Sequence, residues 1–260
     1  MDLKYSINDL ISFSNLLAEE SAKITMSYFR KEIQIEDKSD NTPVTIADKK
    51  AELKIREIIN KKFPNHGILA EEFEHQNKEA DFLWVIDPID GTKSFIAGHK
   101  DFGTLISLLF NKDPIIGIID CPAHNERWVG IKNQNTKLNG KNTNTSDKKK
   151  IEDCYIMTSG LYFDDKEFKI SFDKLRKKTK FCKFGGDCYM YGMLASGLVD
   201  IVIEDTLKIH DYMALIPVIK GAGGIVTDKF GKDISLNSDG SLVASCSQNI
   251  HNQVIQILNP

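Results

Sequence analysis

The sequence lacks the features that mark a membrane-spanning, secreted or zinc-binding protein. No apolar run in its 260 residues reaches the roughly 18 residues that a membrane helix needs. The N-terminus has no basic region followed by an apolar stretch, so we expect no secretory signal and a cytoplasmic location. The five cysteines form no CxxC pair, and their odd number argues against a disulfide framework and a structural zinc site.

The sequence also lacks the positive charge of a nucleic-acid-binding protein and the histidine spacing of a His-liganded metal site. The net charge is −3, so no overall positive field favours nucleic acid as a partner. The six histidines form no HxxxH or HExxH pattern. Any bound metal ion is therefore expected to have oxygen ligands.

The apolar residues predict helices and strands mixed along the whole chain. Helices are expected at residues 6–30, 47–63, 189–198, 211–221 and 249–258. Strands are expected at 68–70, 82–86, 104–110, 115–119, 126–131, 155–158, 200–204, 224–227 and 242–246. The remaining segments include a polar turn at 38–43 and an exposed connection over 133–150. With no internal repeat and no long linker, the pattern predicts a layered α/β or α+β fold without separate, independent domains.

Three acidic groups stand where a predicted strand ends or a predicted helix begins. They are Glu71, the pair Asp87 and Asp90, and Asp211. Strand ends are where open sheets place their functional sites, because the loops there are free of core packing. These carboxylates are therefore the first candidates for a site.

The pair Asp87 and Asp90 is the most informative of these groups. Pro88 is expected to stop the preceding strand, and Gly91 allows the backbone to turn tightly or to approach a ligand. Two carboxylates held this close repel each other unless a cation lies between them. Mg²⁺ prefers such hard oxygen ligands, so the pair is typical of a magnesium site.

Each carboxylate also has a simpler interpretation. The pattern D-P-x-D-G is good turn chemistry without any metal. Glu71 and Glu72 are compatible with a solvated loop, and Asp211 with a helix cap. The residues alone leave both interpretations open.

Four segments, taken in order, resemble the motifs of the inositol monophosphatase superfamily. The run from Asp87 to Phe95, which reads DPIDGTKSF, resembles the signature of that family. The other three are Val44–Asp48, Ile68–Glu72, and His210–Ala214 followed by Gly221–Gly224. Ala70 stands where the family usually has Gly, and His210 where it has Trp. Neither departure is expected to touch a liganding side chain.

The resemblance implies an αβαβα sandwich and a Mg²⁺-dependent phosphomonoesterase, often a homodimer. The chain is then one catalytic domain over 1–260, with an α+β half at about 1–150 and an α/β half at about 151–260. The implied metal ligands, for two or three Mg²⁺ ions per site, are Glu71, Asp87, the Ile89 carbonyl, Asp90 and Asp211. The implied catalytic groups, which orient and deprotonate the attacking water, are Asp48 and Thr92, with Glu71 beside them. The implied substrate contacts are Asp90, Gly91, Thr92, Asp187, Glu204 and Asp211, where Gly91 and Thr92 offer backbone N–H groups to the phosphate.

The second half of the chain resembles the histidinol-phosphate phosphatase branch of that superfamily. The segment Gly185–Tyr189, Gly-Gly-Asp-Cys-Tyr, is similar to one in that branch, and so is Glu126–Trp128. Histidinol phosphate carries an ammonium group and an imidazole, which a carboxylate can meet with a charge-assisted hydrogen bond. Asp187 and Glu204 are the candidates for this role, although Asp187 could also cap the following helix. Tyr189 could pack against the imidazole or lie in the core.

Other substrates and one other class of function stay open. An inositol or related polyol monophosphatase is the main alternative. A nucleotide 3′-phosphatase is disfavoured because no basic cluster stands near the motifs to meet a second phosphate. A catalytically silent scaffold on the same fold is a minor alternative, since every expected carboxylate is present. A polar segment around 31–43 could close over the substrate and add ligands.

Overall fold

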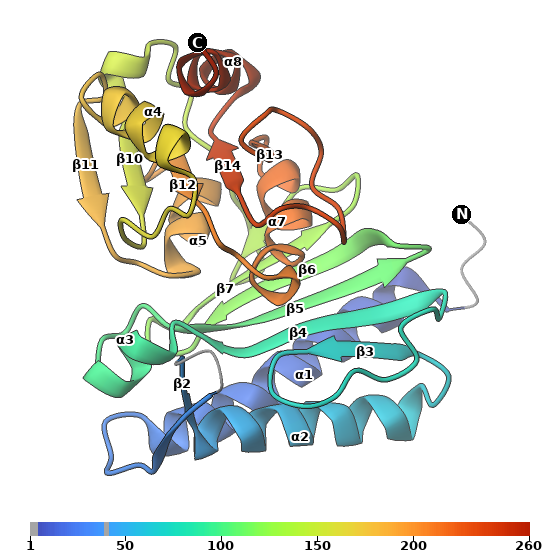
Figure 1. Cartoon of the computed structure of the whole chain (residues 1–260). Coiled ribbons are helices and arrows are strands. Elements are labelled where there is room, and N and C mark those ends of the chain that lie inside the picture. The colour runs from blue at the N-terminus through green and yellow to red at the C-terminus, as the bar shows by residue number, and fades with distance from the viewer. Residues whose placement is uncertain (1–4, 39–41) are drawn as a thin grey trace.

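The computed structural model describes residues 5–38 and 42–260 and arranges them in five layers (Figure 1). The layers are two helices, a seven-stranded sheet, a group of short helices, a five-stranded sheet and two further helices. This is the αβαβα arrangement that the resemblance to the inositol monophosphatase superfamily implies, and it agrees with the layered fold that the sequence pattern predicts. Within the described residues no helix combines the length and the apolar character that crossing a membrane requires.

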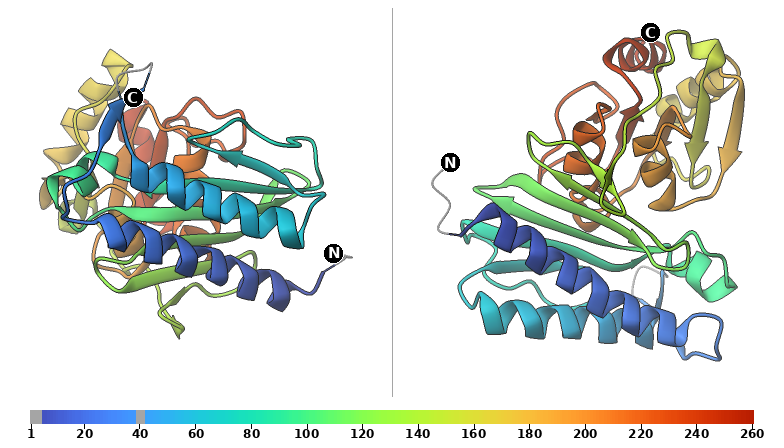
Figure 2. Two further views of the ribbon diagram at one scale, coloured as in Figure 1. Left: turned by 90° about the horizontal axis from the view of Figure 1, so that it is seen from below. Right: turned by 180° about the vertical axis from the view of Figure 1, so that it is seen from behind.

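The first two layers come from the N-terminal half. Helices α1 (Ile7–Tyr28) and α2 (Ile46–Lys62) lie side by side under the larger sheet (Figure 2). That sheet has the order β3-β4-β5-β6-β7-β8-β9. Its strands are β3 (Gly67–Ala70), β4 (Phe82–Asp90), β5 (Gly103–Phe110), β6 (Asp113–Cys121), β7 (Glu126–Ile131), β8 (Lys137–Leu138) and β9 (Lys141–Asn142). A small hairpin of β1 (Ile35–Asp37) and β2 (Pro43–Thr45) precedes α2, and α3 (Thr92–Ala97) follows β4.

The C-terminal half supplies the other layers. Its sheet has the order β11-β10-β12-β14-β13. The strands are β10 (Tyr155–Thr158), β11 (Phe181–Phe184), β12 (Ile201–Glu204), β13 (Ile225–Thr227) and β14 (Leu242–Ser245). One face is covered by α4 (Lys166–Arg176) and α8 (Gln248–Leu258), and a short 3₁₀ helix, η1 (Ile151–Asp153), precedes the sheet. The middle layer holds α5 (Tyr189–Ala195), α6 (Ile209–Tyr212) and α7 (Leu215–Gly221).

Two glycines of the larger sheet let the middle layer pack directly on it. A Cβ on Gly117 would lie 2.1 Å from the carbonyl oxygen of Ala214, and one on Gly130 would lie 2.3 Å from the nitrogen of Val218. No side chain fits in either place, so α7 sits against the backbone of β6 and β7. Because α6 immediately precedes α7, this close packing holds α6, which carries Asp211, against β4 and β5.

The strand that carries Asp87 does not stop there, so the expected end at Pro88 is wrong. Strand β4 continues to Asp90 through an irregularity in its pairing with β5. Asp87 pairs with Leu105 and Asp90 with Gly103, so β4 has one more residue than its partner over this stretch. Pro88 is tolerated because it falls in this bulge, where a missing N–H breaks no regular ladder bond.

The expected helix at 211–221 is also wrong as a single element. The chain forms α6 and α7 with a turn at Met213 and Ala214 between them. Pro217 has no N–H, so it could not continue a helix from Met213, but it fits the first turn of a new one. Asp211 therefore lies in the first turn of the short helix α6, and its carboxylate accepts the Lys208 N–H at 2.7 Å as part of a capping box, as the helix-cap interpretation expects.

Two other expectations need smaller corrections. The helix expected at 189–198 ends at Ala195, and Ser196 is its C-cap. The connection at 133–150 contains the short strands β8 and β9, and Thr136 within it is fully buried. Part of the turn expected at 38–43, namely residues 39–41, lies outside the described residues.

Candidate active site

The predicted metal ligands come together from both halves of the chain. Glu71 follows β3, Asp87 and Asp90 lie at the irregular end of β4, and Asp211 lies on α6. Carboxylate oxygens of Asp87, Asp90 and Asp211 all lie within 4.8 Å of one another. Glu71 and Asp87 form a second such group, with His210 as its third member.

Burial and mutual repulsion dominate the electrostatics of this carboxylate cluster. Burial and then the charge of Glu71 and other carboxylates raise the pKa of Asp87 well above its ordinary value. Burial and the charges of neighbouring carboxylates likewise raise the pKa of Asp90, and burial raises that of Asp211. Burial would also raise the pKa of Glu71, but the charges of His210 and Lys38 outweigh it, and the pKa is lowered. The charges of His210 and Lys208 act on Asp211 in the same direction, but burial outweighs them there and its pKa stays raised.

This donor set fits a divalent cation. Buried carboxylates are normally paired with a cation or bind a metal, since burying an uncompensated charge is costly. The charges of His210, whose Nε2 lies 3.4 Å from Asp211, and of Lys208 lower the pKa of Asp211, yet burial keeps the pKa values of Asp87, Asp90 and Asp211 raised. Carboxylate oxygens at this spacing suit Mg²⁺, Ca²⁺ or Mn²⁺. The cluster therefore has the chemistry of the metal site that the sequence predicts.

The predicted catalytic pair, Asp48 and Thr92, lies beside the cluster. Asp48 is fully buried in the first turn of α2, where its Oδ2 accepts the Thr45 N–H at 2.8 Å and the Thr45 hydroxyl at 2.5 Å. Its other oxygen lies 3.3 Å from the Thr92 hydroxyl, which also lies 3.1 Å from the Ile89 carbonyl. Burial raises the pKa of Asp48, with the charge of Glu71 acting in the same direction. The helix cap thus holds Asp48 in a fixed orientation toward Thr92.

Gly91 and Asp187 are in direct contact. Gly91 has φ +83° as the residue before α3, and a Cβ there would lie 2.9 Å from the Asp187 carboxyl carbon. The Asp187 carboxylate accepts the Ser94 hydroxyl at 2.5 Å. Helix α5 has no side-chain cap, so the alternative in which Asp187 caps it is not what the structure has. The next residue, Cys188, donates its N–H to Asp90 at 2.5 Å, which ties this segment to the cluster.

Glu204 is a further buried carboxylate near the cluster. It ends β12 and accepts the Tyr191 hydroxyl at 2.7 Å. Burial raises the pKa of Glu204 to about 7, and the charges of Asp187 and Asp211 add to this effect. Tyr189, in contrast, stacks on His124 with ring centroids 4.0 Å apart, so one face of its ring is already covered.

Lys38 is a site residue that the motifs did not identify. It follows β1 and its ammonium lies 2.6 Å from Glu71 and 2.7 Å from Glu72. Hydrogen bonds to these two carboxylates raise the pKa of Lys38 although burial opposes the shift. The only signal in the sequence was the position of a polar segment before the first motif, which did not single out one residue.

His210 contradicts the expectation that it touches no liganding side chain. Its Nε2 lies 3.4 Å from Asp211 Oδ1 and 3.9 Å from Glu71 Oε1. The side chain reaches the cluster because α6 presents residue 210 to the same site as its neighbour Asp211. The substitution of the usual Trp therefore changes the surroundings of the predicted metal ligands.

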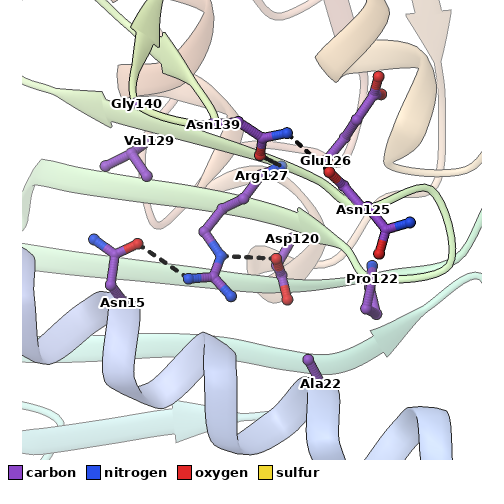
Figure 3. A pocket seen from close by; sticks show the side chains of 10 residues that line it. All are labelled: Asn15, Ala22, Asp120, Pro122, Asn125, Glu126, Arg127, Val129, Asn139 and Gly140. Carbon is purple, nitrogen blue, oxygen red and sulfur yellow. Dashed lines mark hydrogen bonds and ion pairs between the residues drawn. The ribbon is translucent and has the colours of Figure 1, made fainter.

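Arg127 of the Glu-Arg-Trp segment lies away from the carboxylate cluster. It lines a pocket of about 450 Å³ between α1 and the larger sheet, where Figure 3 shows its guanidinium between Asn15 and Asp120. It donates to Asp120 at 2.8 Å and to Asn15 at 3.2 Å. Because side chains alternate along β7, Trp128 points to the opposite face and packs in the core below α5. Arg127 thus links α1 to the sheet.

Comparison with known proteins places these features in a family. The chain matches the Inositol monophosphatase family over residues 7–259. A bifunctional chloroplastic phosphatase of Arabidopsis thaliana, IMPL2, is 44% identical over 94% of this chain and 73% of its own length. A histidinol-phosphatase of Chlorobaculum parvum is 33% identical over 88% of this chain and 89% of its own.

Solved structures agree with the sequence relatives. An inositol monophosphatase from Zymomonas mobilis superposes with a TM-score of 0.89 at 37% identity, over 99% of this chain and all of that one. Proteins of this kind are generally metal-dependent, and the carboxylate cluster described above is in keeping with that. The family match spans both halves of the chain and includes every carboxylate of the cluster. The chain therefore belongs to the inositol monophosphatase family and is a phosphatase.

Proposed function

We propose that the protein hydrolyses L-histidinol phosphate to L-histidinol and phosphate, with two or three Mg²⁺ ions in the site. The observation that carries this proposal is a second acidic group beside the metal cluster. Asp187 and Glu204 lie close enough to Asp90 that their charges help to raise its pKa. A substrate with its phosphate at the metal cluster and a cationic group a few atoms away would neutralise both.

Divalent cations bound by the cluster would supply positive charge to the phosphate and activate water for attack. The protein's own residues would prepare the reaction. Thr92 lies between Asp48 and the Ile89 carbonyl, so its hydroxyl can hold the attacking water. Asp48, with its pKa raised and its orientation fixed by Thr45, is suited to accept the proton through Thr92. Gly91 and Thr92 stand at the start of α3, where their N–H groups are the candidates for the phosphate oxygens.

The charge of the site favours an amino-alcohol phosphate over a polyol phosphate. Histidinol phosphate brings an ammonium group, and inositol phosphate brings only hydroxyls. Burial raises the pKa of Glu204 to about 7, so a cationic partner would make its ionised form more favourable. The relatives named histidinol-phosphatase support the same choice, and the inositol monophosphatase of Zymomonas mobilis supports the alternative.

Phosphate release from L-histidinol phosphate and inositol 1-phosphate, measured side by side with Mg²⁺ and an EDTA control, tests the proposal. We expect a kcat/KM at least about 100-fold higher for histidinol phosphate, or roughly 2.7 kcal/mol of transition-state binding. A preference for the inositol ester would overturn the substrate and leave the metal chemistry in place. Activity that persists in EDTA would overturn the metal dependence.

Two variants test the role of the second acidic group. Asp187→Asn removes the charge and should raise KM for histidinol phosphate far more than for β-glycerophosphate, which has no ammonium group. Ser94→Ala is the matched control, because it removes the hydrogen bond to Asp187 and keeps the charge. Equal effects of Asp187→Asn on both substrates would exclude an ammonium contact.

We also propose that residues 1–260 act as one catalytic domain. Glu71, Asp87 and Asp90 belong to the first half and Asp211 to the second, so neither half has the complete set. Expression of the two halves as separate chains, each folded alone, should give no magnesium-dependent turnover. Turnover by one half alone would contradict this view.

A further inference from the structure

The His210 ring nitrogen lies where a metal ligand would lie. Its distances to the neighbouring carboxylate oxygens are too long for a good hydrogen bond. His210 is only 9% exposed, and its Nε2 faces the carboxylates of Glu71 and Asp211. The distances are 3.4 Å to Asp211 and 3.9 Å to Glu71, and a ring nitrogen lies within 4.8 Å of an Asp87 oxygen. A good N–H···O bond has a donor–acceptor distance below about 3.2 Å.

These separations match those between ligands that share one ion. Donors about 2.1 Å from a metal lie roughly 3.0 Å apart when adjacent and 4.2 Å apart when opposite in an octahedron. One donor atom from each of Glu71, Asp87 and His210 lies within 4.8 Å of the other two, and the 3.9 Å between His210 Nε2 and Glu71 Oε1 falls inside this range. An ion among them would need to draw the three side chains inward by only a few tenths of an ångström.

We propose that His210 Nε2 is a direct ligand of the cation held by Glu71 and Asp87. The inference rests on the metal dependence in the proposed function and is independent of the substrate. It makes this position a mixed nitrogen and oxygen site, whereas Asp87, Asp90 and Asp211 form an all-oxygen site.

A nitrogen ligand changes which metals the site prefers. Imidazole suits transition metals, and carboxylates suit Mg²⁺ and Mn²⁺. Replacing His210 should therefore weaken Co²⁺ binding more than Mg²⁺ binding. The Trp that the family usually has at this position offers no nitrogen lone pair to a metal, since its indole N–H acts only as a hydrogen-bond donor.

Pulsed electron paramagnetic resonance of the Mn²⁺-loaded full-length protein is the direct test. A coordinated imidazole gives a ¹⁴N hyperfine coupling to Mn²⁺, and labelling the histidines with ¹⁵N must change it. Spectra are recorded from one equivalent of Mn²⁺ to saturation, so that both cation positions are sampled. We expect the coupling in the wild type and its loss in His210→Phe and His210→Trp. His75→Gln is the control, because it removes an exposed histidine four residues after Glu71.

The possible results separate the two proposals. Bound Mn²⁺ without histidine coupling at saturation overturns the role of His210 and leaves the metal-dependent function standing. Failure of Mn²⁺ to bind at all overturns both. Calorimetry adds a second readout, in which His210→Phe should lose at least roughly tenfold in Co²⁺ affinity. Its Mg²⁺ affinity should change by less than about threefold. Equal losses for the two metals would mean that the substitution only disturbs the site.

Discussion

Replacing Asp90 by Asn should stabilise the metal-free protein while removing its response to magnesium. Asp90 is held against Asp87 and Asp211, and burial and neighbouring carboxylates raise its pKa well above the ordinary value. Asn has the same shape and keeps an oxygen that can accept the Cys188 N–H, now bonded at 2.5 Å. The substitution therefore removes a repelling charge without opening a cavity.

The size of the effect follows from the spacing. The carboxylate oxygens lie within 4.8 Å of one another, and two ionised groups at that limit repel by roughly 3.5 kcal/mol at an effective dielectric constant of about 20. Proton uptake relieves part of this repulsion, because a raised pKa keeps some members of the cluster neutral. We therefore expect a gain of about 1–3 kcal/mol in the metal-free state. For a chain of this size each kcal/mol shifts Tm by about 2–4 °C.

Thermal unfolding in EDTA and in a magnesium series measures both effects. Magnesium at 100 times its Kd should stabilise the wild type by about 2.7 kcal/mol and Asp90→Asn by much less. Turnover of the variant should be abolished. Asp113→Asn is the control, because Asp113 is an exposed carboxylate paired with Lys132, and its loss should change stability by at most about 1 kcal/mol. A lower Tm for Asp90→Asn in EDTA, or an unchanged magnesium response, would refute the reasoning.

Three further perturbations test other parts of the structure. Thr92→Val should lower kcat by about 10²–10⁴-fold, because it breaks the link to Asp48, while calorimetry finds metal affinity unchanged. Gly91→Ala should cost about 1–3 kcal/mol in urea unfolding, because φ is +83° and the new Cβ meets Asp187; unchanged stability would show that the loop adapts. Burial lowers the pKa of His251 from 6.5 to about 4, so the unfolded chain takes up the proton first. Stability should fall by about 3 kcal/mol as pH drops from 6.5 to 4, and His251→Gln should flatten that dependence.

The carboxylates that cluster could be predicted because each stands in a local motif with its own chemistry. Asp87 and Asp90 are three residues apart, next to a glycine, and an apolar strand precedes them. Lys38 and His210 could not be found in this way. Lys38 approaches Glu71 only because the β1–β2 hairpin folds back, and His210 does so because α7 packs on two glycines of the sheet. Both contacts depend on tertiary packing that no local pattern encodes.

The errors in the predicted secondary structure have similar physical causes. Pro88 normally ends a strand, but a bulge in the pairing with β5 accommodates it. Helix α4 was missed although Phe168, Ser171, Phe172 and Leu175 are buried at helical spacing and Asp165 caps its start. Charged residues between those positions obscure the apolar helical pattern in the sequence. Strand β11, with three exposed residues out of four, carries no burial pattern to detect.

The cationic neighbours of Glu71 imply an order of metal binding. Lys38 forms direct ion pairs with Glu71 and Glu72, and the pKa of Glu71 is lowered, whereas the three pKa values of the Asp87–Asp90–Asp211 group are all raised. The first cation should therefore bind at that group, and a second one at Glu71 must displace the Lys38 ammonium. Lys38→Met should tighten the second binding event in a magnesium titration by calorimetry and leave the first nearly unchanged. Lys49→Met, which removes an exposed pair with Glu36, should change neither. Weaker second binding in Lys38→Met would show that the ammonium supports the site and does not compete for it.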